Sequence, residues 1–243
     1  MIVEKRDHLI IDLDGVIEYQ EGLAPGAREF VDALRKSHYT FCFLTNDAAN
    51  GAKERAKDLQ DYGLNVYENE IVTCQELCVE YLRNNGLSKP FIIGKPFINH
   101  TGKDFDCVVV GDFFNCYDYK KLVRAFNILC DGYPLVAAQS KPVSTVNGVT
   151  TPDIGFWIAA FEYSTTKKAT IVGKPSHFSY ATAMKGKAFG RGIMISDEIN
   201  PDIVGAKKLG LYTIFIGPKD ENNQSLVDCN TSDLFELKEK LGI

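Results

Sequence analysis

Ile10-Ile11-Asp12-Leu13-Asp14-Gly15-Val16 is the stretch that decides the fold, because an apolar run there leads directly into two carboxylates one residue apart. The glycine that follows lets the backbone turn sharply. An Asp-rich turn at a strand end is one explanation. However, two acids this close to one strand tip repel each other unless a cation lies between them. A divalent metal held by carboxylate oxygens would supply that cation.

Three further apolar runs end in polar residues that can carry chemistry. The first leads into Thr45-Asn46-Asp47, the second into Gly173-Lys174-Pro175-Ser176, and the third into Ser196-Asp197-Glu198, with Asp202 close behind. Taken singly, the Thr45 segment is also explained as an ordinary loop, Lys174 as a solvated lysine, and the acids at 197 and 202 as helix caps. In this order after the two aspartates, they are more specific than any one of them alone.

Short apolar runs recur along the chain and are predicted to be buried strands. They span residues 9–11, 41–44, 91–93, 107–110, 135–138, 170–172, 193–195 and 212–216. Between many of them lie stretches with helical spacing, for example 30–34 and 122–129. This alternation predicts an α/β fold made of parallel βαβ units. An open parallel sheet binds its ligand at the carboxyl ends of its strands, where the polar strand ends would meet.

Together, these motifs resemble the haloacid dehalogenase (HAD) superfamily of aspartate-nucleophile phosphatases, and in detail its NagD-like branch, which includes p-nitrophenylphosphatases. The resemblance covers nearly the whole chain. It is carried by Asp12-Leu13-Asp14-Gly15-Val16, Pro25-Gly26-Ala27, Leu44-Thr45-Asn46, Tyr62-Gly63-Leu64, Val108-Val109-Val110-Gly111, Val172-Gly173-Lys174-Pro175-Ser176 and Asp202-Ile203-Val204-Gly205-Ala206. It implies a Rossmann-like parallel-sheet core, residues 1–74 and 166–243, with an inserted α/β cap domain at residues 75–165.

The resemblance also implies a phosphatase that hydrolyses small phosphomonoesters through an aspartyl-phosphate intermediate. Asp12 would be the nucleophile, and Asp14 would act first as general acid and then as general base. Thr45, Asn46 and Lys174 would bind the phosphoryl group. Lys174 would also keep Asp12 ionised.

Mg²⁺ is the implied cofactor, because hard oxygen ligands suit it and it screens the repulsion between the phosphate and the attacking carboxylate. The family pattern gives as ligands the Asp12 carboxylate, the main-chain carbonyl of Asp14 and Asp197. Asp202 would bind the metal through water or support a ligand.

Two positions depart from the family pattern. Ser196-Asp197-Glu198 replaces the usual Gly-Asp-Arg, and Asp47 stands where the family more often has Asn. Both changes predict a more acidic entrance to the predicted active site, which argues against the small anionic substrates that are usual in the family. Gly94-Lys95-Pro96 repeats the Gly-Lys-Pro motif, but it lies in the predicted cap, so Lys174 is the preferred phosphate ligand.

Composition restricts the location and the partners. The 243 residues are 45% hydrophobic and 24% charged, which is typical of a globular protein. The net charge of −5, without a basic run, argues against nucleic acid or a membrane surface as partner. Acidic residues within 1–14 argue against a signal peptide, and seven cysteines without a C-x-x-C pair predict reduced core thiols in a cytoplasmic protein. The predicted partners are a small phosphorylated metabolite and, from the resemblance, a second copy bound through the cap.

Other functions remain open from the sequence. A catalytically weak HAD-fold protein that binds a phosphorylated metabolite or partner is compatible with the two departures, but the retained catalytic residue types oppose it. A dehalogenase would use Asp12 and Lys174, yet it has no use for Asp14 and Asp197 as acid and metal groups. A dinucleotide-binding enzyme is disfavoured because no G-x-G-x-x-G follows the first strand.

Overall fold

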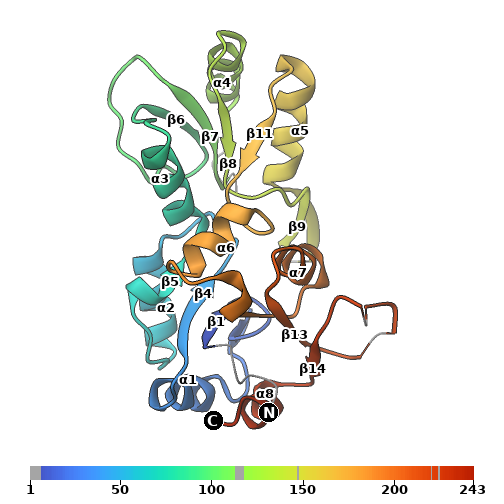
Figure 1. The fold of residues 1–243 in the computed structure, drawn as a ribbon. Helices are drawn as coiled ribbons and strands as arrows, with labels where there is room; N and C mark the ends of the chain where they lie inside the picture. The colour runs from blue at the N-terminus through green and yellow to red at the C-terminus, as the bar shows by residue number, and fades with distance from the viewer. Residues whose placement is uncertain (1–6, 113–117, 147, 220, 224) are drawn as a thin grey trace. The chain divides into compact units, whose positions relative to one another are not determined.

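The computed structural model describes residues 7–112, 118–146, 148–219, 221–223 and 225–243. The chain forms two compact units, whose helices and strands are labelled in Figure 1. Unit 1 contains Met1–Thr45, Ala52–Val72 and Lys174–Ile243, and unit 2 contains Asn46–Gly51 and Thr73–Gly173. In the parts of the chain that are described, no helix is both long and apolar enough to cross a membrane.

Unit 1 is built on a six-stranded parallel sheet with the strand order β14-β13-β12-β1-β4-β5. The strands are β1 (His8–Ile11), β4 (Thr40–Leu44), β5 (Ile71–Val72), β12 (Gly192–Ser196), β13 (Tyr212–Ile216) and β14 (Cys229–Thr231). Ile11, the last residue of β1, is aligned with Ile195 of β12 and Phe43 of β4. The polar residues that follow these three strands therefore leave the sheet at the same edge.

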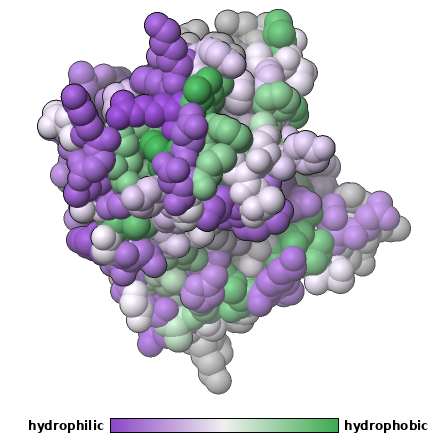
Figure 2. All heavy atoms as spheres, turned by 90° about the horizontal axis from the view of Figure 1, so that it is seen from above, coloured by the Kyte–Doolittle hydropathy of each residue, from purple (hydrophilic) through white to green (hydrophobic). Residues whose placement is uncertain are grey.

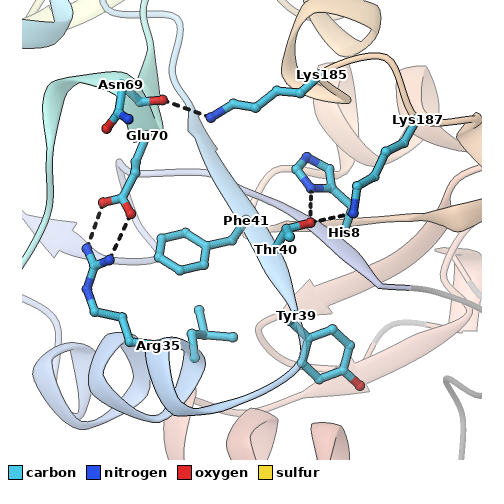
Figure 3. Close-up of a pocket in the computed structure, with 10 residues that line it drawn as sticks. His8, Arg35, Tyr39, Thr40, Phe41, Asn69, Glu70, Lys185 and Lys187 are labelled. Atoms are coloured by element: carbon cyan, nitrogen blue, oxygen red, sulfur yellow. Dashed lines mark hydrogen bonds and ion pairs between the residues drawn. The ribbon is translucent and has the colours of Figure 1, made fainter.

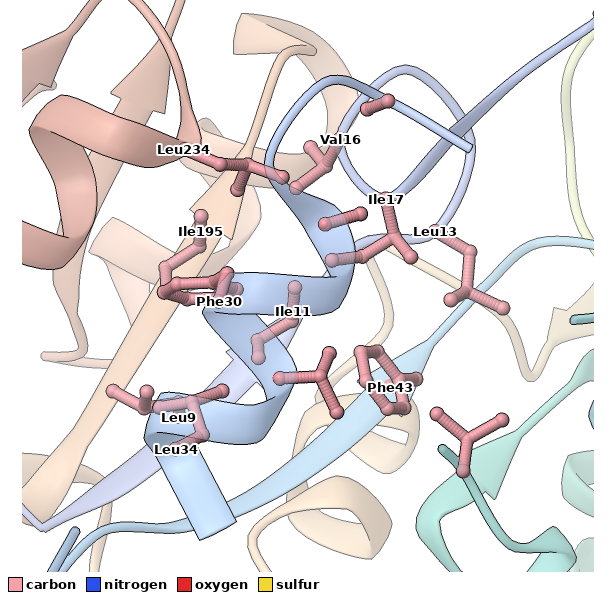
Figure 4. Close-up of a cluster of buried hydrophobic side chains, with 14 of the residues drawn as sticks. Leu9, Ile11, Leu13, Val16, Ile17, Phe30, Leu34, Phe43, Ile195 and Leu234 are labelled. Carbon is pink, nitrogen blue, oxygen red and sulfur yellow. The ribbon is translucent and has the colours of Figure 1, made fainter. Parts of the chain in front are cut away.

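The core of unit 1 lies between this sheet and its helices. Phe30 and Leu34 lie on one face of α1 (Ala27–Lys36), because residues four apart are neighbours on a helix surface. Figure 4 shows these two side chains among Leu9, Ile11 and Ile195 from β1 and β12. All five are at most 1% exposed. Both flanking strands of β1 and the covering helix thus fix the position of the strand that delivers Asp12.

The other elements of unit 1 are short. A hairpin of β2 (Glu18–Tyr19) and β3 (Gly22–Leu23) follows the first strand. The helices are α2 (Ala52–Asp61), α6 (His177–Ala183), α7 (Val204–Lys208) and α8 (Leu234–Leu241), with single helical turns at Glu68–Glu70, Phe189–Arg191, Ile199–Ile203 and Glu221–Asn223.

Unit 2 has its own four-stranded parallel sheet, in the order β11-β8-β7-β6. The strands are β6 (Pro90–Ile93), β7 (Cys107–Val110), β8 (Leu135–Ala137) and β11 (Ala169–Ile171), accompanied by an antiparallel hairpin of β9 (Val143–Val146) and β10 (Val149–Pro152). The helices are α3 (Cys74–Asn84), α4 (Tyr119–Cys130) and α5 (Ile154–Thr165). Thr73 caps α3 and Asp118 caps α4 through side-chain oxygens that accept main-chain N–H groups.

The predicted α/β class is confirmed, and each apolar run predicted to be a strand contains one. The helix predicted from the spacing at 122–129 is confirmed as part of α4, in which Ala125, Ile128 and Leu129 are buried while Val123 and Phe126 are exposed. The structure also differs from the predicted ranges in three places, because residues 46–51, 73–74 and 166–173 were predicted in the core but belong to unit 2. In the last of these segments, β11 pairs with β8 in the sheet of unit 2.

The cysteines are free thiols in the described part of the chain. Cys42, Cys74, Cys78 and Cys107 are buried, whereas Cys130 is exposed, so the prediction of core thiols is wrong for Cys130. Cys116 lies outside the described residues. Burial raises the pKa of Cys42 and of Cys78 to about 12, which keeps both thiols protonated and unreactive.

The surface is largely hydrophilic on the face drawn in Figure 2, where hydrophobic residues lie in small separate groups. Large exposed side chains such as Tyr119 and Tyr163 are amphipathic, with a hydroxyl that remains in contact with water.

Candidate functional site

The side chain of Asp12 is fixed at the tip of β1 by hydrogen bonds from neighbouring segments. Its Oδ1 accepts the N–H of Leu13 at 2.9 Å and lies 2.7 Å from Nζ of Lys174. The hydroxyl of Ser196 lies 3.2 Å from Oδ2, and the main-chain N–H of Asp12 donates to the carbonyl of Ile195 at 2.9 Å. Asp12 is only 4% exposed, so its orientation is set before any ligand binds.

Lys174 lies between two buried carboxylates. Its Nζ is 2.7 Å from Asp12 Oδ1 and 2.6 Å from Asp202 Oδ2, and all three residues are at most 4% exposed. Burial raises the pKa of Asp12 well above its usual range; the nearby Lys174 charge opposes this shift and Asp202 adds to it. Burial alone would lower the pKa of Lys174, but the two carboxylates outweigh it and raise that pKa. One ammonium group therefore faces two carboxylates in a water-poor site.

Ser196 and Tyr180 complete this network, and neither was singled out as a site residue from the sequence. The Ser196 hydroxyl lies 2.8 Å from Asp202 Oδ2, closer than its 3.2 Å to Asp12, so Asp202 is the preferred acceptor of its one proton. The Tyr180 hydroxyl donates to the main-chain carbonyl of Asp202 at 2.8 Å. The position of Ser196, directly before Asp197 at a strand tip, is the sequence signal that could have identified it.

Asp14 differs from Asp12 in its surroundings, although only one residue separates them. Asp14 is exposed, and its Oδ2 accepts the hydroxyl of Thr45 at 3.0 Å. Thr45 follows β4 and is fully buried, with its N–H bonded to the carbonyl of Val72 at 3.1 Å. One carboxylate is thus buried and held by a cation, while the other is reachable from solvent and oriented by a hydroxyl.

Asp197 lies against the backbone of the Asp14 loop. An ideal Cβ placed on Gly15 would be only 2.0 Å from Asp197 Oδ2, and Gly15 has φ +80°, so a larger residue is excluded on both grounds. Burial raises the pKa of Asp197, and the charges of Glu198 and Asp202 raise it further. The close approach of this carboxylate to the loop explains the glycine after Asp14.

The donor set fits a hard divalent cation. Asp197 Oδ1 and Asp202 Oδ1 are buried carboxylate oxygens without a hydrogen-bond partner among the described residues. Such oxygens are costly unless a cation or water satisfies them. Among the described residues, no three His, Cys, Asp or Glu side chains surround one point. A site formed by the Asp12 and Asp197 carboxylates and the Asp14 main-chain carbonyl needs only two side chains, and water would complete the octahedron that Mg²⁺ requires.

The remaining predicted residues lie in unit 2. Asn46 directly follows Thr45 in the chain, and the Cys74 thiol donates to its Oδ1 at 3.8 Å. The carboxylate of Asp47 accepts the N–H groups of Ala49 at 2.7 Å and Asn50 at 3.0 Å, which is a local turn interaction. The structure brings Asp12, Asp14, Thr45, Lys174, Asp197 and Asp202 into unit 1, but not Asn46.

A buried ion pair between Glu18 and Arg55 supports the Asp14 loop and was also missed from the sequence. Glu18 Oε1 contacts Nη2 of Arg55 on α2, and both side chains are at most 11% exposed. The carbonyl of Glu18 accepts the N–H of Gly15 at 2.8 Å, and its own N–H donates to Leu13 at 3.0 Å. The pair therefore ties the loop that carries Asp14 to a helix of unit 1.

We expect Glu18→Gln to lower the stability of unit 1 by about 3 kcal/mol, because a buried guanidinium would then face a neutral amide. The measurement is the urea midpoint of unfolding followed by circular dichroism. Glu21→Gln is the matched control, since Glu21 is exposed in the same hairpin region. Equal midpoints for Glu18→Gln and the parent protein would contradict a stabilising role for the pair.

Comparisons with known proteins agree with this architecture. A family model described as haloacid dehalogenase-like hydrolase matches residues 9–107, and a second, described as HAD-hydrolase-like, matches residues 171–226. The chain is 26% identical to human haloacid dehalogenase-like hydrolase domain-containing protein 2 over 214 residues, which are 86% of this chain and 83% of that protein. It is 28% identical over 221 residues to the rat phospholysine phosphohistidine inorganic pyrophosphate phosphatase, covering 85% and 81% of the two chains.

Solved structures give the same result. The 4-nitrophenylphosphatase of Thermotoga maritima is similar with a TM-score of 0.87 and 25% identity, over 98% of both chains. NagD from Escherichia coli K-12 shares the fold with a TM-score of 0.85 at 20% identity, over 96% of this chain and 98% of that one. The two family models together match well over half of the chain. The chain therefore belongs to the haloacid dehalogenase-like hydrolases.

Proposed function

We propose that this protein is a Mg²⁺-dependent phosphatase that hydrolyses small phosphomonoesters through an aspartyl-phosphate intermediate. The observation that carries the proposal is the pair of unlike aspartates. Asp12 is buried at the end of β1 in contact with Lys174, whereas the exposed Asp14 is held by Thr45. A nucleophile needs a fixed oxygen that can be ionised, and the Lys174 charge opposes the rise that burial causes in the pKa of Asp12; a proton donor needs access to the leaving group.

In the first step, a carboxylate oxygen of Asp12 forms a bond to phosphorus and the bond from phosphorus to the ester oxygen breaks. Asp14 gives its proton to that leaving oxygen, so the alcohol departs neutral. In the second step, Asp14 takes a proton from water as the water oxygen attacks phosphorus, which releases phosphate and restores the Asp12 carboxylate. Asp14 thus ends each cycle protonated again.

The phosphoryl group gains negative charge on its oxygens in such a transfer, and fixed positive charge stabilises it. Lys174 supplies that charge beside Asp12. The N–H of Thr45 is bonded to Val72 and its hydroxyl donates its one proton to Asp14, so Thr45 would donate to a phosphoryl oxygen only by turning this hydroxyl away from Asp14. Mg²⁺ bound by Asp12, Asp197 and the Asp14 carbonyl would neutralise further charge at the same place.

The relatives support removal of a phosphoryl group, and one structural neighbour supports an ester as the substrate. One is named for dephosphorylating phospholysine, phosphohistidine and inorganic pyrophosphate, and one structural neighbour is a 4-nitrophenylphosphatase. All of these activities remove a phosphoryl group: from nitrogen in phospholysine and phosphohistidine, from phosphate in pyrophosphate, and from an ester oxygen in 4-nitrophenyl phosphate. A cytoplasmic location is part of the proposal and is supported by the free thiols, because reducing compartments keep such groups unpaired.

Turnover of p-nitrophenyl phosphate tests the proposal directly. We expect activity with Mg²⁺, loss of at least about 100-fold after chelation, and recovery when Mg²⁺ is restored. Ca²⁺ should support the reaction poorly, because it prefers more ligands and looser geometry than Mg²⁺. Full activity in excess chelator would exclude the metal assignment. Phosphate binding without any turnover would favour a non-catalytic HAD-fold protein.

Asp197→Asn is the matched variant for the same experiment. It removes one ligand charge and keeps the size of the side chain, so the Mg²⁺ concentration for half-maximal activity should rise. Asp233→Asn removes a carboxylate that caps α8 instead, and it should leave this concentration unchanged. An unaltered metal dependence in Asp197→Asn would exclude Asp197 from the metal site.

A further inference from the structure

A pocket of about 680 Å³ lies in unit 1, away from the proposed catalytic residues. His8 and Thr40, which begin β1 and β4, line it, whereas Asp12 and Thr45 follow the other ends of the same strands. At about 3.3 Å per residue, the two ends of these strands are roughly 15 Å apart. The pocket is therefore separate from the proposed active site.

Two lysines on the loop after α6 reach into this pocket, as Figure 3 shows. Nζ of Lys185 donates to the main-chain carbonyl of Asn69 at 2.8 Å, and Nζ of Lys187 donates to the Thr40 hydroxyl at 2.7 Å. The nearest carboxylate to Lys187 is Asp7, at 3.5 Å, and in the described part of the chain Lys185 has no carboxylate partner. Each ammonium group carries three N–H donors, so both can bond to an anion.

The opposite wall is electrically balanced and partly aromatic. Arg35 is held by both oxygens of Glu70, at 2.8 and 2.7 Å, and its guanidinium lies 5.5 Å from the centre of the Phe41 ring. Phe41 is partly exposed and lies between Arg35 and the lysines in Figure 3. The pocket thus offers an aromatic face at its centre and excess positive charge at one side, in a protein whose net charge is −5.

The backbone of Lys185 is in the left-handed region, with φ 50°. This conformation costs free energy for any residue with a Cβ, and it is usually taken by glycine. The next residue, Gly186, is also left-handed at φ 82°. Lys185 directly follows Met184, the C-cap of α6, where a left-handed residue commonly ends a helix, and this turn places the lysine beside the pocket.

We propose that this pocket binds a small phosphorylated organic anion, with the phosphate on Lys185 and Lys187 and a planar or apolar group over Phe41. The two ammonium groups match a dianionic head group, and the aromatic ring buries an apolar body. This ligand site is distinct from the catalytic one and does not depend on the proposed phosphatase activity.

Calorimetric titration of the full chain with phenylphosphonate tests the proposal. This probe has an aromatic ring and a dianionic head group, and its carbon–phosphorus bond resists hydrolysis. The double variant Lys185→Gln/Lys187→Gln should bind one equivalent of phenylphosphonate fewer than the parent protein does. It should keep the parent's kcat and KM for p-nitrophenyl phosphate. The charge-preserving Lys185→Arg/Lys187→Arg should retain that equivalent.

Lys120→Gln/Lys121→Gln is the matched control, since it removes two charges from the exposed face of α4 in unit 2. It should keep the full stoichiometry. An equal loss in this control would reveal non-specific attraction and overturn the proposal, and so would equal stoichiometry in the parent and the Lys185/Lys187 glutamine variant.

The role of Phe41 has its own measurement. At the site defined by the two lysines, methylphosphonate should bind about tenfold more weakly than phenylphosphonate, because it leaves the ring uncovered. Equal affinities of the two probes would overturn the assignment of an organic ligand.

Discussion

Asp12→Asn should abolish hydrolysis of every phosphate ester, by a factor on the order of 10⁴ or more, because the amide cannot form the covalent intermediate. The side chain keeps its size, and Asp202 still neutralises Lys174, so the fold should persist. The measurements are turnover of p-nitrophenyl phosphate and of an alkyl phosphate, together with the intact mass of the quenched protein. Neither an initial burst of nitrophenol nor a phosphorylated protein should be detected.

Asp32→Asn is the control for this loss, because Asp32 is an exposed aspartate on α1 of the same unit. It should leave turnover unchanged. Circular dichroism of Asp12→Asn should show a folded protein, which separates loss of the nucleophile from loss of structure. Substantial turnover by a folded Asp12→Asn protein would contradict the assignment.

Asp14→Asn should give a different result, because it removes only proton transfer. The amide oxygen can still accept the Thr45 hydroxyl, so the loop should keep its position. Alkyl phosphates need the acid because their leaving alkoxide is strongly basic, and their turnover should fall by about 10²- to 10⁴-fold. p-Nitrophenyl phosphate releases a stabilised phenolate with little help. It should therefore still give one burst of nitrophenol.

The second step then lacks its base, so aspartyl phosphate should accumulate in Asp14→Asn and increase the intact mass by one phosphoryl group. Quenched-flow measurement of the burst and mass spectrometry of the protein check this together. If Asp12→Asn kept the burst while Asp14→Asn formed no phosphorylated protein, the nucleophile would be Asp14 instead.

The sequence by itself determined the fold class and where the chemistry-bearing residues enter the chain. Apolar runs of strand length alternate with helical spacing, and this local pattern is enough to predict parallel βαβ units. Asp12, Thr45 and Asp197 each follow such a run, so their common sheet edge follows from parallel strands alone. The sequence also predicted a sharp turn at Gly15, which has φ 80° in the structure.

Only the tertiary structure decided the electrostatics of the site. Lys174 contacts Asp12 and Asp202, which are 162 and 28 residues away in the chain. The Glu18–Arg55 ion pair joins the β2–β3 hairpin to α2, which follows β4 in the chain. No local pattern encodes such contacts, because they depend on strand order and on how the loops pack across the sheet edge.

The same holds for the different environments of the two aspartates and for the second pocket. Asp12 and Asp14 are the same residue type one position apart, yet one is buried and the other exposed, because the chain turns between the strand end and the hairpin. Lys185 and Lys187 had no sequence signal, since single lysines in loops are ordinary. Local periodicity thus determined the strands, the helices and the sheet edge that carries the predicted catalytic residues. The burial of each side chain and its ion-pair partners, which set its charge and reactivity, arose only when distant segments came together on folding.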